Sequence, residues 1–313
     1  MALPTLLDIA KMNGSDPVVG LIDETTKAHP ELRLGYARTI KGFQYKTLVR
    51  TALGNPTTGS FRAANQGTSP IKHTYENRTI STYILNPRFE CDKAVADSHE
   101  DGREAYIAME NSGTLEGETA ALARQFYYGN STGGNGNALG FPGLIDAYDA
   151  TNMVVDAGGT TASTGSGAWL VKWGPKDVGW VWGENGKLEL GDIRTESIPD
   201  PVDSTKRFTG YVSDMLARPG LQVGSVQSLV RIKKLTEDSG KGMTDALIIR
   251  ALAKFPSGQK PDVIFMSRRS LAQLQASRTA TNATGAPAPI PTESQQIPIE
   301  VTDSIMDTES LTL

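Results

Sequence analysis

The segment from residue 39 to residue 90 places the strongest constraint on the fold, because its side chains alternate with a period of two. Over residues 43–51, aromatic and β-branched side chains alternate with mostly polar ones, and a second such run covers residues 74–85. The stretch between them, residues 54–70, is rich in Gly, Asn, Thr and Ser. This pattern predicts a long β-hairpin with an irregular tip. An isolated two-stranded hairpin is only marginally stable in water, so we expect it to need a partner surface, from its own chain or from a neighbour.

A long helical segment follows the hairpin. Apolar side chains recur at three- and four-residue spacing over residues 92–128, among many acidic ones. This spacing predicts one long helix or two helices end to end. Gly102, Gly113 and Gly117 each lower helix stability by about 1 kcal/mol relative to alanine, so we expect kinks or breaks there. Gly129 is expected to end the segment.

The remaining pattern predicts an α+β fold. Residues 5–12 and 18–26 are expected to form two short helices, which are too small for a core of their own and indicate a terminal arm. A glycine-rich loop spans residues 133–143, and Asn185–Gly186 is a strong signal for a β-hairpin turn. The other expected strands are residues 168–173, 178–182, 187–190, 221–235, 262–266 and 297–302, and the other expected helices are residues 244–255 and 269–276.

Composition narrows the class of protein. The chain has 313 residues, of which 38% are hydrophobic and 21% charged, which indicates a globular protein with a buried core. Its net charge of -4 argues against a surface that neutralises phosphates, since nucleic-acid binding relies on clustered Lys and Arg. No apolar run approaches the roughly 20 residues that a membrane span needs, and the N-terminus does not have the pattern of a signal peptide. We therefore expect no specific nucleic-acid binding and no membrane association.

Residues that could catalyse a reaction or hold a metal ion do not form a recognisable pattern. The histidines His29, His73 and His99 are scattered, so we expect no metal site. Cys91, the only cysteine, has no evident histidine partner, which favours a packed residue over a nucleophile. Ser131 lies in a Gly-x-Ser-x-Gly sequence, but a nucleophile elbow requires a strand before the serine and a helix after it. Here a helix precedes and a glycine loop follows, so we expect no enzyme activity and no cofactor.

Four tryptophans, Trp169, Trp173, Trp180 and Trp182, lie close together in the chain. Their spacing puts each pair on one face of its expected strand. Packing in a core or between subunits is the favoured interpretation. A platform on which sugar rings stack is the alternative.

Two adjacent segments carry opposite net charge. Within residues 39–90 seven Lys and Arg oppose two Glu, giving +5, and within residues 91–126 three Lys and Arg oppose eight acidic residues, giving -5. Such segments could fold onto each other, or they could hold neighbouring copies in a head-to-tail contact that closes into a ring. The candidate contact residues are Lys41, Lys46, Arg50, Arg62, Lys72 and Arg78 in the hairpin, and Glu100, Glu104, Glu110, Glu116 and Glu118 in the helical segment.

Five stretches occur in a distinctive order along the chain: LARQFYYG (122–129), GFPGL (140–144), VRIK (230–233), VIFMSRR (263–269) and IPIEVTD (297–303). In amino-acid sequence and in order, they resemble segments of the major capsid proteins of tailed bacteriophages and prophages. In that family the corresponding parts are the end of the spine helix, the turn after it, a strand returning to the peripheral domain, the axial-domain strand and helix, and the closing strand.

The resemblance implies a division of the chain. It suggests an N-terminal arm (residues 1–38), an extended loop formed by the β-hairpin (39–90), a peripheral domain with the spine helix (92–128) and the Trp-rich strands (91–235 in all), and an axial domain with the closing strand (236–313).

The resemblance also implies a function. Hexamers and pentamers of such a chain form the icosahedral head of the virion, assembled in the cytoplasm of a bacterial host, and enclose double-stranded DNA without binding it specifically. A scaffolding protein and a portal are implied as partners, with a cement or decoration protein as a further candidate. The alternative is a virion surface or carbohydrate-binding protein that uses the cluster from Trp169 to Trp182.

Overall fold

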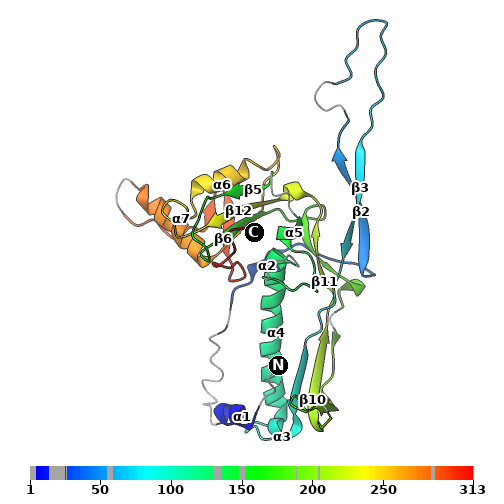
Figure 1. The fold of residues 1–313 in the computed structure, drawn as a ribbon, viewed down its shortest axis with the longest axis vertical. Helices are drawn as coiled ribbons and strands as arrows, with labels where there is room; N and C mark the ends of the chain where they lie inside the picture. The colour runs from blue at the N-terminus through cyan, green and yellow to red at the C-terminus, as the bar shows by residue number, and fades with distance from the viewer. Residues whose placement is uncertain are drawn as a thin grey trace.

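The computed structural model describes residues 5–13, 25, 27–54, 59–129, 135–147, 152–187, 189–203, 205–282 and 286–312. The molecule is elongated and has three parts (Figure 1). A central body of sheets and helices carries a two-stranded hairpin that projects from one end, and a lower part surrounds the start of the long helix α4 (Arg103–Tyr128). The separate helical and sheet regions confirm the predicted α+β fold.

A six-stranded sheet separates two apolar cores in the body. Its strands lie in the order β14 (Glu293–Ser294), β15 (Ile297–Val301), β13 (Val263–Met266), β6 (Ser166–Val171), β12 (Leu229–Leu235) and β5 (Val154–Asp156). β6 runs antiparallel to both β13 and β12, whereas the pairs β13–β15 and β12–β5 are parallel. Successive side chains of a strand point to opposite faces, and every residue of β6 is buried. Both faces of the sheet are therefore covered.

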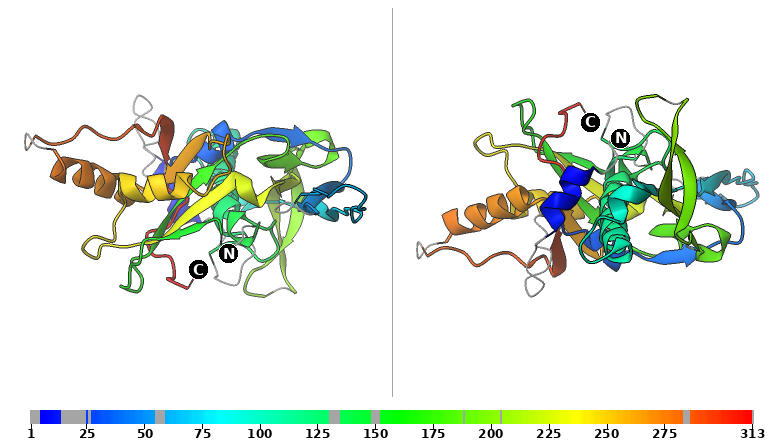
Figure 2. Two further views of the ribbon diagram at one scale, coloured as in Figure 1. Left: turned by 90° about the horizontal axis from the view of Figure 1, so that it is seen from above. Right: turned by 90° about the horizontal axis from the view of Figure 1, so that it is seen from below.

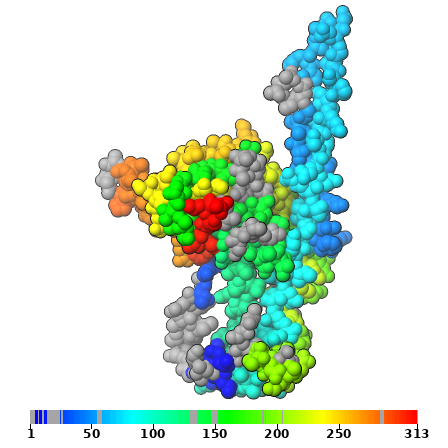
Figure 3. Space-filling model, viewed as in Figure 1, coloured from blue at the N-terminus to red at the C-terminus, as the bar shows by residue number. Residues whose placement is uncertain are grey.

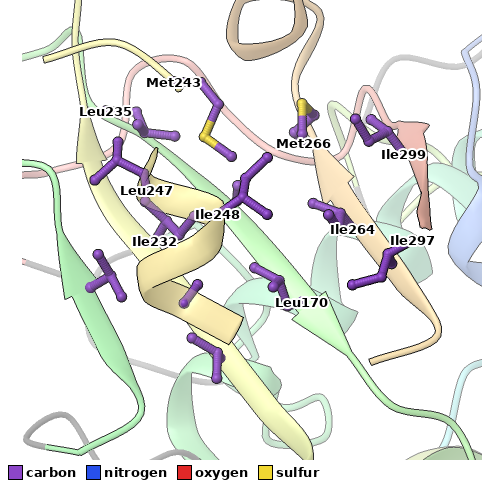
Figure 4. Packing of buried hydrophobic residues seen from close by; sticks show 14 of the residues in the cluster. Leu170, Ile232, Leu235, Met243, Leu247, Ile248, Ile264, Met266, Ile297 and Ile299 are labelled. Carbon is purple, nitrogen blue, oxygen red and sulfur yellow. The ribbon is translucent and has the colours of Figure 1, made fainter. Parts of the chain in front are cut away.

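Two helices, α6 (Asp245–Leu252) and α7 (Arg268–Ala280), cover one face of this sheet. Leu170 and Ile232 from the sheet pack there against Leu247 and Ile248 of α6 (Figure 4). The helix begins where the Thr244 side chain accepts a hydrogen bond from the backbone N–H of Leu247, the usual way to satisfy a free N–H at a helix start. Burying an aliphatic side chain contributes about 1.5–3 kcal/mol, so this core is a main source of stability.

The C-terminal end of α4 covers the other face. Phe126, Tyr127 and Tyr128 are fully buried there, in the core that contains Trp169 and Phe265. A second sheet adjoins this core, with β7 (Val178–Trp182) between β1 (Ala37–Thr39) and β11 (Pro219–Val223). The aromatic end of α4 therefore holds the two sheets together.

A third sheet and the start of α4 form the lower part of the molecule. Its central strand β10 (Arg207–Leu216) pairs with β4 (Arg88–Asp92) on one side and with β8 (Glu189–Leu190) and β9 (Arg194–Pro199) on the other. Phe89 and Cys91 of β4 pack with Tyr106 of α4 in a small core. The short helices α1 (Leu6–Met12) and α3 (Lys93–Ala96) complete it, the former through Ile9.

Helix α4 runs from the body to the lower part of the molecule (Figure 1), and its middle lies in neither core. Its buried residues lie near its two ends, and none of residues 108–121 is buried. Gly113 and Gly117 have nothing within 4 Å of the place where a Cβ would stand, yet the helix passes through both, so the breaks expected there are wrong. Packing of both ends in cores stabilises the helix more than two glycines weaken it. Gly102 does separate α3 from α4, and Gly129, with φ of 58°, ends α4.

Strands β2 (Gln44–Ala52) and β3 (Thr74–Ser81) form the projecting hairpin, which confirms the prediction from the period of two. The described residues of its tip, 53–54 and 59–73, contain no helix or strand. Figure 2 shows that the hairpin and α7 lie on opposite sides of the body.

Some local predictions fail. The turn at Asn185–Gly186 does not close a hairpin, because β7 and β8 lie in different sheets and a 3₁₀ turn (Glu184–Gly186) leads from one to the other. The strand expected over residues 221–235 is two strands, β11 and β12. The helix expected over residues 18–26 falls, apart from Thr25, outside the described residues. The sequence did not predict helix α2 (Pro30–Leu34), nor strands β9 and β10.

Candidate assembly surfaces

The base of the hairpin is fixed to the body by side chains on its inward face. The Tyr45 hydroxyl donates a hydrogen bond to the Gln222 side chain of β11, and the Arg38 guanidinium lies 4.3 Å from the centroid of the Tyr45 ring. Ile80 packs against Val181 of β7. These contacts orient the stem, so the rest of the hairpin extends away from the body as a separate projection (Figure 3).

The opposite face of the stem is exposed. Alternation places Lys46, Leu48 and Arg50 on one face of β2, and the strand register puts Tyr75 of β3 opposite Arg50. All four side chains are exposed, Leu48 to 65% and Tyr75 to 53%. Apolar and aromatic side chains between cations are typical of a surface that binds another protein. We call these four residues the exposed hairpin face.

The other hairpin cations occupy different positions. Lys41 lies before β2, and Arg62 and Lys72 lie in the tip, as does Phe61, which is 96% exposed. Arg78 lies on the inward side, where it is 3.9 Å from Glu76 and donates a hydrogen bond to the carbonyl of Gly224 (3.4 Å). Arg78 therefore helps to fix the hairpin base, whereas the exposed cations are available to another molecule.

Two charges counted with the hairpin in the sequence, Arg88 and Glu90, belong to the lower sheet. Arg88 on β4 lies 2.6 Å from Glu90 and 3.0 Å from Glu196 of β9. The charge division nevertheless holds without them. Residues 41–81 contain six Lys and Arg and one Glu, which again gives +5.

The acidic candidates are distributed along α4 and just before it. Glu100 and Glu104 are exposed near the start of the helix, Glu116 is exposed at its middle, and Glu110 and Glu118 are half-buried. Burial raises the pKa of Glu110, and the nearby Asp8 adds repulsion in the same direction. The hairpin and α4 extend in opposite directions from the body (Figure 1). A single subunit therefore does not fold its basic hairpin onto its own acidic helix.

The tryptophan cluster is part of the core. Trp169 and Trp180 are fully buried. The Phe126 ring of α4 stacks between neighbours, with its centroid 5.7 Å from that of Trp173 and 5.1 Å from that of Trp180. This confirms the prediction of core packing and leaves Trp169 and Trp180 no face on which a sugar could stack.

The comparison with protein families decides the class of protein. The family model described as "Major capsid protein GP7" matches residues 26–312. The chain belongs to the major capsid protein GP7 family. It is a structural protein of a tailed-phage head and not an enzyme, and its place is the capsid of the virion, where copies assemble with one another into a shell.

Solved structures place this capsid protein in a known fold. It is similar to a chain of the cryo-electron microscopy structure of bacteriophage Epsilon15, with a TM-score of 0.74 and 24% identity over 99% of this chain and 98% of that one. The capsid of Myoviridae phage XM1 matches at a TM-score of 0.49 and 11% identity, over 72% of this chain and 98% of that one. The Epsilon15 likeness confirms the capsid fold that the sequence resemblance implied. No curated protein matches the chain.

Of the two candidate nucleophiles of this capsid protein, the structure describes only Cys91. Cys91 is buried, and burial raises the pKa of its thiol to about 11, so it is a packed residue as predicted. Ser131 lies outside the described residues. Among the described residues, no three His, Cys, Asp or Glu are grouped so that they could hold a metal ion. Over the same part of the chain, no helix has the length and apolar character needed to cross a membrane.

The sequence reasoning missed buried charges that hold the C-terminal segment to the body. Arg231 of β12 and Glu309 are 1% and 2% exposed, with their closest atoms 2.7 Å apart. The Tyr128 hydroxyl of α4 donates a hydrogen bond to Glu309 (2.6 Å). An arginine between Val230 and Ile232 in an apolar strand was the available signal, because buried arginines are found paired.

Proposed function

We propose that this capsid subunit assembles as hexamers and pentamers in which the exposed hairpin face of one copy lies on the acidic start of α4 in the next copy. One observation carries the proposal: the basic hairpin and the acidic helix of a subunit extend away from each other (Figure 1). Two different surfaces that match in charge but cannot meet within a chain favour a heterologous contact. Such contacts generate rings when the rotation between copies closes.

Charge and apolar contact have separate parts in the proposed interface. An exposed ion pair contributes only about 0–1 kcal/mol, so opposite charge mainly sets the register and speeds the encounter. Binding energy in protein interfaces comes chiefly from a few large side chains that become buried. Leu48, Tyr75 and Phe61, which are exposed in the single subunit, are the candidates for this role.

The domains and partners follow the architecture that the family resemblance suggests. The projecting hairpin corresponds to the extended loop, α4 to the spine helix, and residues around α1 to the N-terminal arm. The six-stranded sheet draws β5, β6 and β12 from residues up to 235 and β13, β14 and β15 from residues after it, which supports an axial domain that also includes strands from before the boundary expected at residue 235. A scaffolding protein and a portal are the expected further partners.

The test reverses the charge of the exposed hairpin face. Lys46→Glu combined with Arg50→Glu replaces attraction by repulsion at each interface. The contact should weaken by about 1–2 kcal/mol, so the subunit concentration at which shells form should rise about 5- to 30-fold. Shell formation is followed by light scattering and negative-stain microscopy, with the scaffolding protein co-expressed. Circular dichroism of the subunit should not change, since both side chains are exposed.

Two further variants act as controls. Arg50→Lys keeps the charge and should assemble like the wild type. Adding Glu104→Lys to the reversed hairpin restores opposite charges and should recover part of the assembly. Normal assembly of the Lys46→Glu/Arg50→Glu variant would contradict the proposed contact.

A further inference from the structure

A buried carboxyl joins the segment that precedes the hairpin to the C-terminal segment. Glu31 lies on α2, which begins with Pro30, and its side chain is fully buried. The Oε1 atom of Glu31 accepts hydrogen bonds from the hydroxyls of Ser304 (2.7 Å) and Thr302 (3.2 Å). Its backbone carbonyl accepts a further bond from the Trp180 indole N–H (3.1 Å). An ionisable group thus lies inside the contact between two distant parts of the chain.

His29 connects this carboxyl to the surface. Its Nδ1 lies 2.8 Å from Ser304 Oγ and 3.8 Å from Glu31 Oε1, and its side chain is 11% exposed. A hydroxyl has one hydrogen to donate, and that of Ser304 goes to Glu31. The hydrogen between His29 and Ser304 therefore belongs to Nδ1. The chain from His29 through Ser304 to Glu31 offers a proton path between water and the buried carboxyl.

The surroundings favour the neutral form of this site. Glu31 Oε2 is buried with no close hydrogen-bond partner among the described residues, and the neighbouring Tyr127 hydroxyl offsets only part of the cost of burying a charge there. Burial raises the pKa of Glu31 to about 7 and lowers that of His29. Asp303 and Lys27 are the other charged groups that act on His29, and they shift its pKa in opposite directions. An ionised carboxylate at this position is costly because burial removes it from water.

We propose that Glu31, His29 and Ser304 form a proton-dependent contact that holds residues 27–34 against residues 302–304. The site is neutral when the Glu31 carboxyl is protonated beside a neutral His29, or when the carboxylate faces a protonated His29, and the segment then stays docked. Loss of this ionisable proton leaves a carboxylate beside a neutral His29, and the buried negative charge favours opening, which exposes Glu31 to water. This regulation is independent of the contact between hairpin and α4, and it acts on the segment that leads into the hairpin.

The direction and size of the effect follow from linkage. The folded-state pKa of Glu31 lies above its ordinary value, from 4.5 to about 7, so its stabilising contribution is present at low pH and is lost as the pH rises through about 7. For these two values, the open population should rise about tenfold between pH 6 and pH 8.5. Glu31→Gln cannot ionise and keeps an acceptor oxygen for Ser304 and Thr302. In this variant, opening of residues 27–34 should not depend on pH over this range.

Hydrogen–deuterium exchange of the whole chain tests the proposal. Exchange of residues 27–36 is compared between wild type and Glu31→Gln at each pH, so that the intrinsic pH dependence of exchange cancels. The ratio of the wild-type rate to the variant rate should rise about tenfold from pH 6 to pH 8.5. A ratio that stays constant or falls overturns the proposal.

Two other variants complete the test. Glu300→Gln is the matched control, because Glu300 of β15, just before the second segment, lies 3.7 Å from Arg33 of α2 in a partly exposed pair. Exchange of residues 27–36 in Glu300→Gln should depend on pH as it does in the wild type. Loss of the pH dependence in this variant would assign the effect to the pair of Arg33 and Glu300 instead. Ser304→Ala removes the link but keeps the carboxyl, so residues 27–36 should exchange faster at every pH and retain the pH dependence. If Ser304→Ala exchanges at the same rate as the wild type, the proposed proton-dependent contact is contradicted.

Discussion

Replacement of Glu309 by leucine should destabilise the folded subunit by about 3–5 kcal/mol, the usual effect of removing one member of a buried ion pair. Arg231 and Glu309 are 1% and 2% exposed. In the variant the Arg231 guanidinium, 5.1 Å from the centroid of the Trp169 ring, loses its buried counter-ion. The Tyr128 hydroxyl loses the acceptor 2.6 Å away, a hydrogen bond worth about 1 kcal/mol.

A double-mutant cycle separates the charge effect from the loss of packing. Arg231→Met combined with Glu309→Leu removes both charges and fills the space with apolar groups, a change that often has little effect on stability or increases it. The double variant should therefore be more stable than Glu309→Leu alone, although it carries one more substitution. We expect a coupling energy of at least about 2 kcal/mol, within the range seen for residues in contact.

Urea unfolding followed by tryptophan fluorescence measures each free energy from the midpoint and the slope. Glu300→Leu, at a partly exposed pair, should lower stability by no more than about 1 kcal/mol. If the double variant is destabilised by the sum of the single effects, the two side chains are not coupled and the reasoning is refuted.

Two further predictions concern single residues. Gly129→Ala should lower stability by more than about 2 kcal/mol, because the added Cβ would lie 1.9 Å from the Gly143 nitrogen at a φ of 58°. Gly113→Ala, in open space on the same helix, should instead raise stability by about 0.5–1 kcal/mol; thermal unfolding of the two variants gives the comparison. Cys91, whose pKa burial raises to about 11, should resist thiol reagents at pH 8 until the chain is unfolded, and rapid labelling of the folded protein would disprove this.

The elements that the sequence predicted are those whose pattern is local. The hairpin followed from a period of two on both sides of a turn-rich stretch, and the strands β13 and β15 from short apolar runs. For α4 the apolar spacing was sufficient, but the effect of Gly113 was overestimated. The helix ends are held by Phe126 and its neighbours in one core and by Tyr106 in another, and tertiary packing of this kind outweighs helix propensity.

The failures concern pairing and burial over long distances. Nothing near Asn185 shows that β7 and β8 belong to different sheets. Glu31 in a short helix is indistinguishable by sequence from an exposed glutamate, because its burial depends on Ser304 and Thr302 at the other end of the chain. The opposite charges of the hairpin and the helical segment were visible in the sequence, but their orientation away from each other was not.

The docking of α2 on the C-terminal segment also bears on the order of folding. The hydrogen bonds from Ser304 to Glu31 and from Ala28 to Asp303 join positions 273 and 275 residues apart. Each closes a loop of nearly the whole molecule, and the entropy of closing it is lost before the contact adds stability. The sheets between them can form from nearer neighbours in the chain, so this closure comes late. A subunit whose sheets have formed can thus meet other copies before α2 has reached its final place.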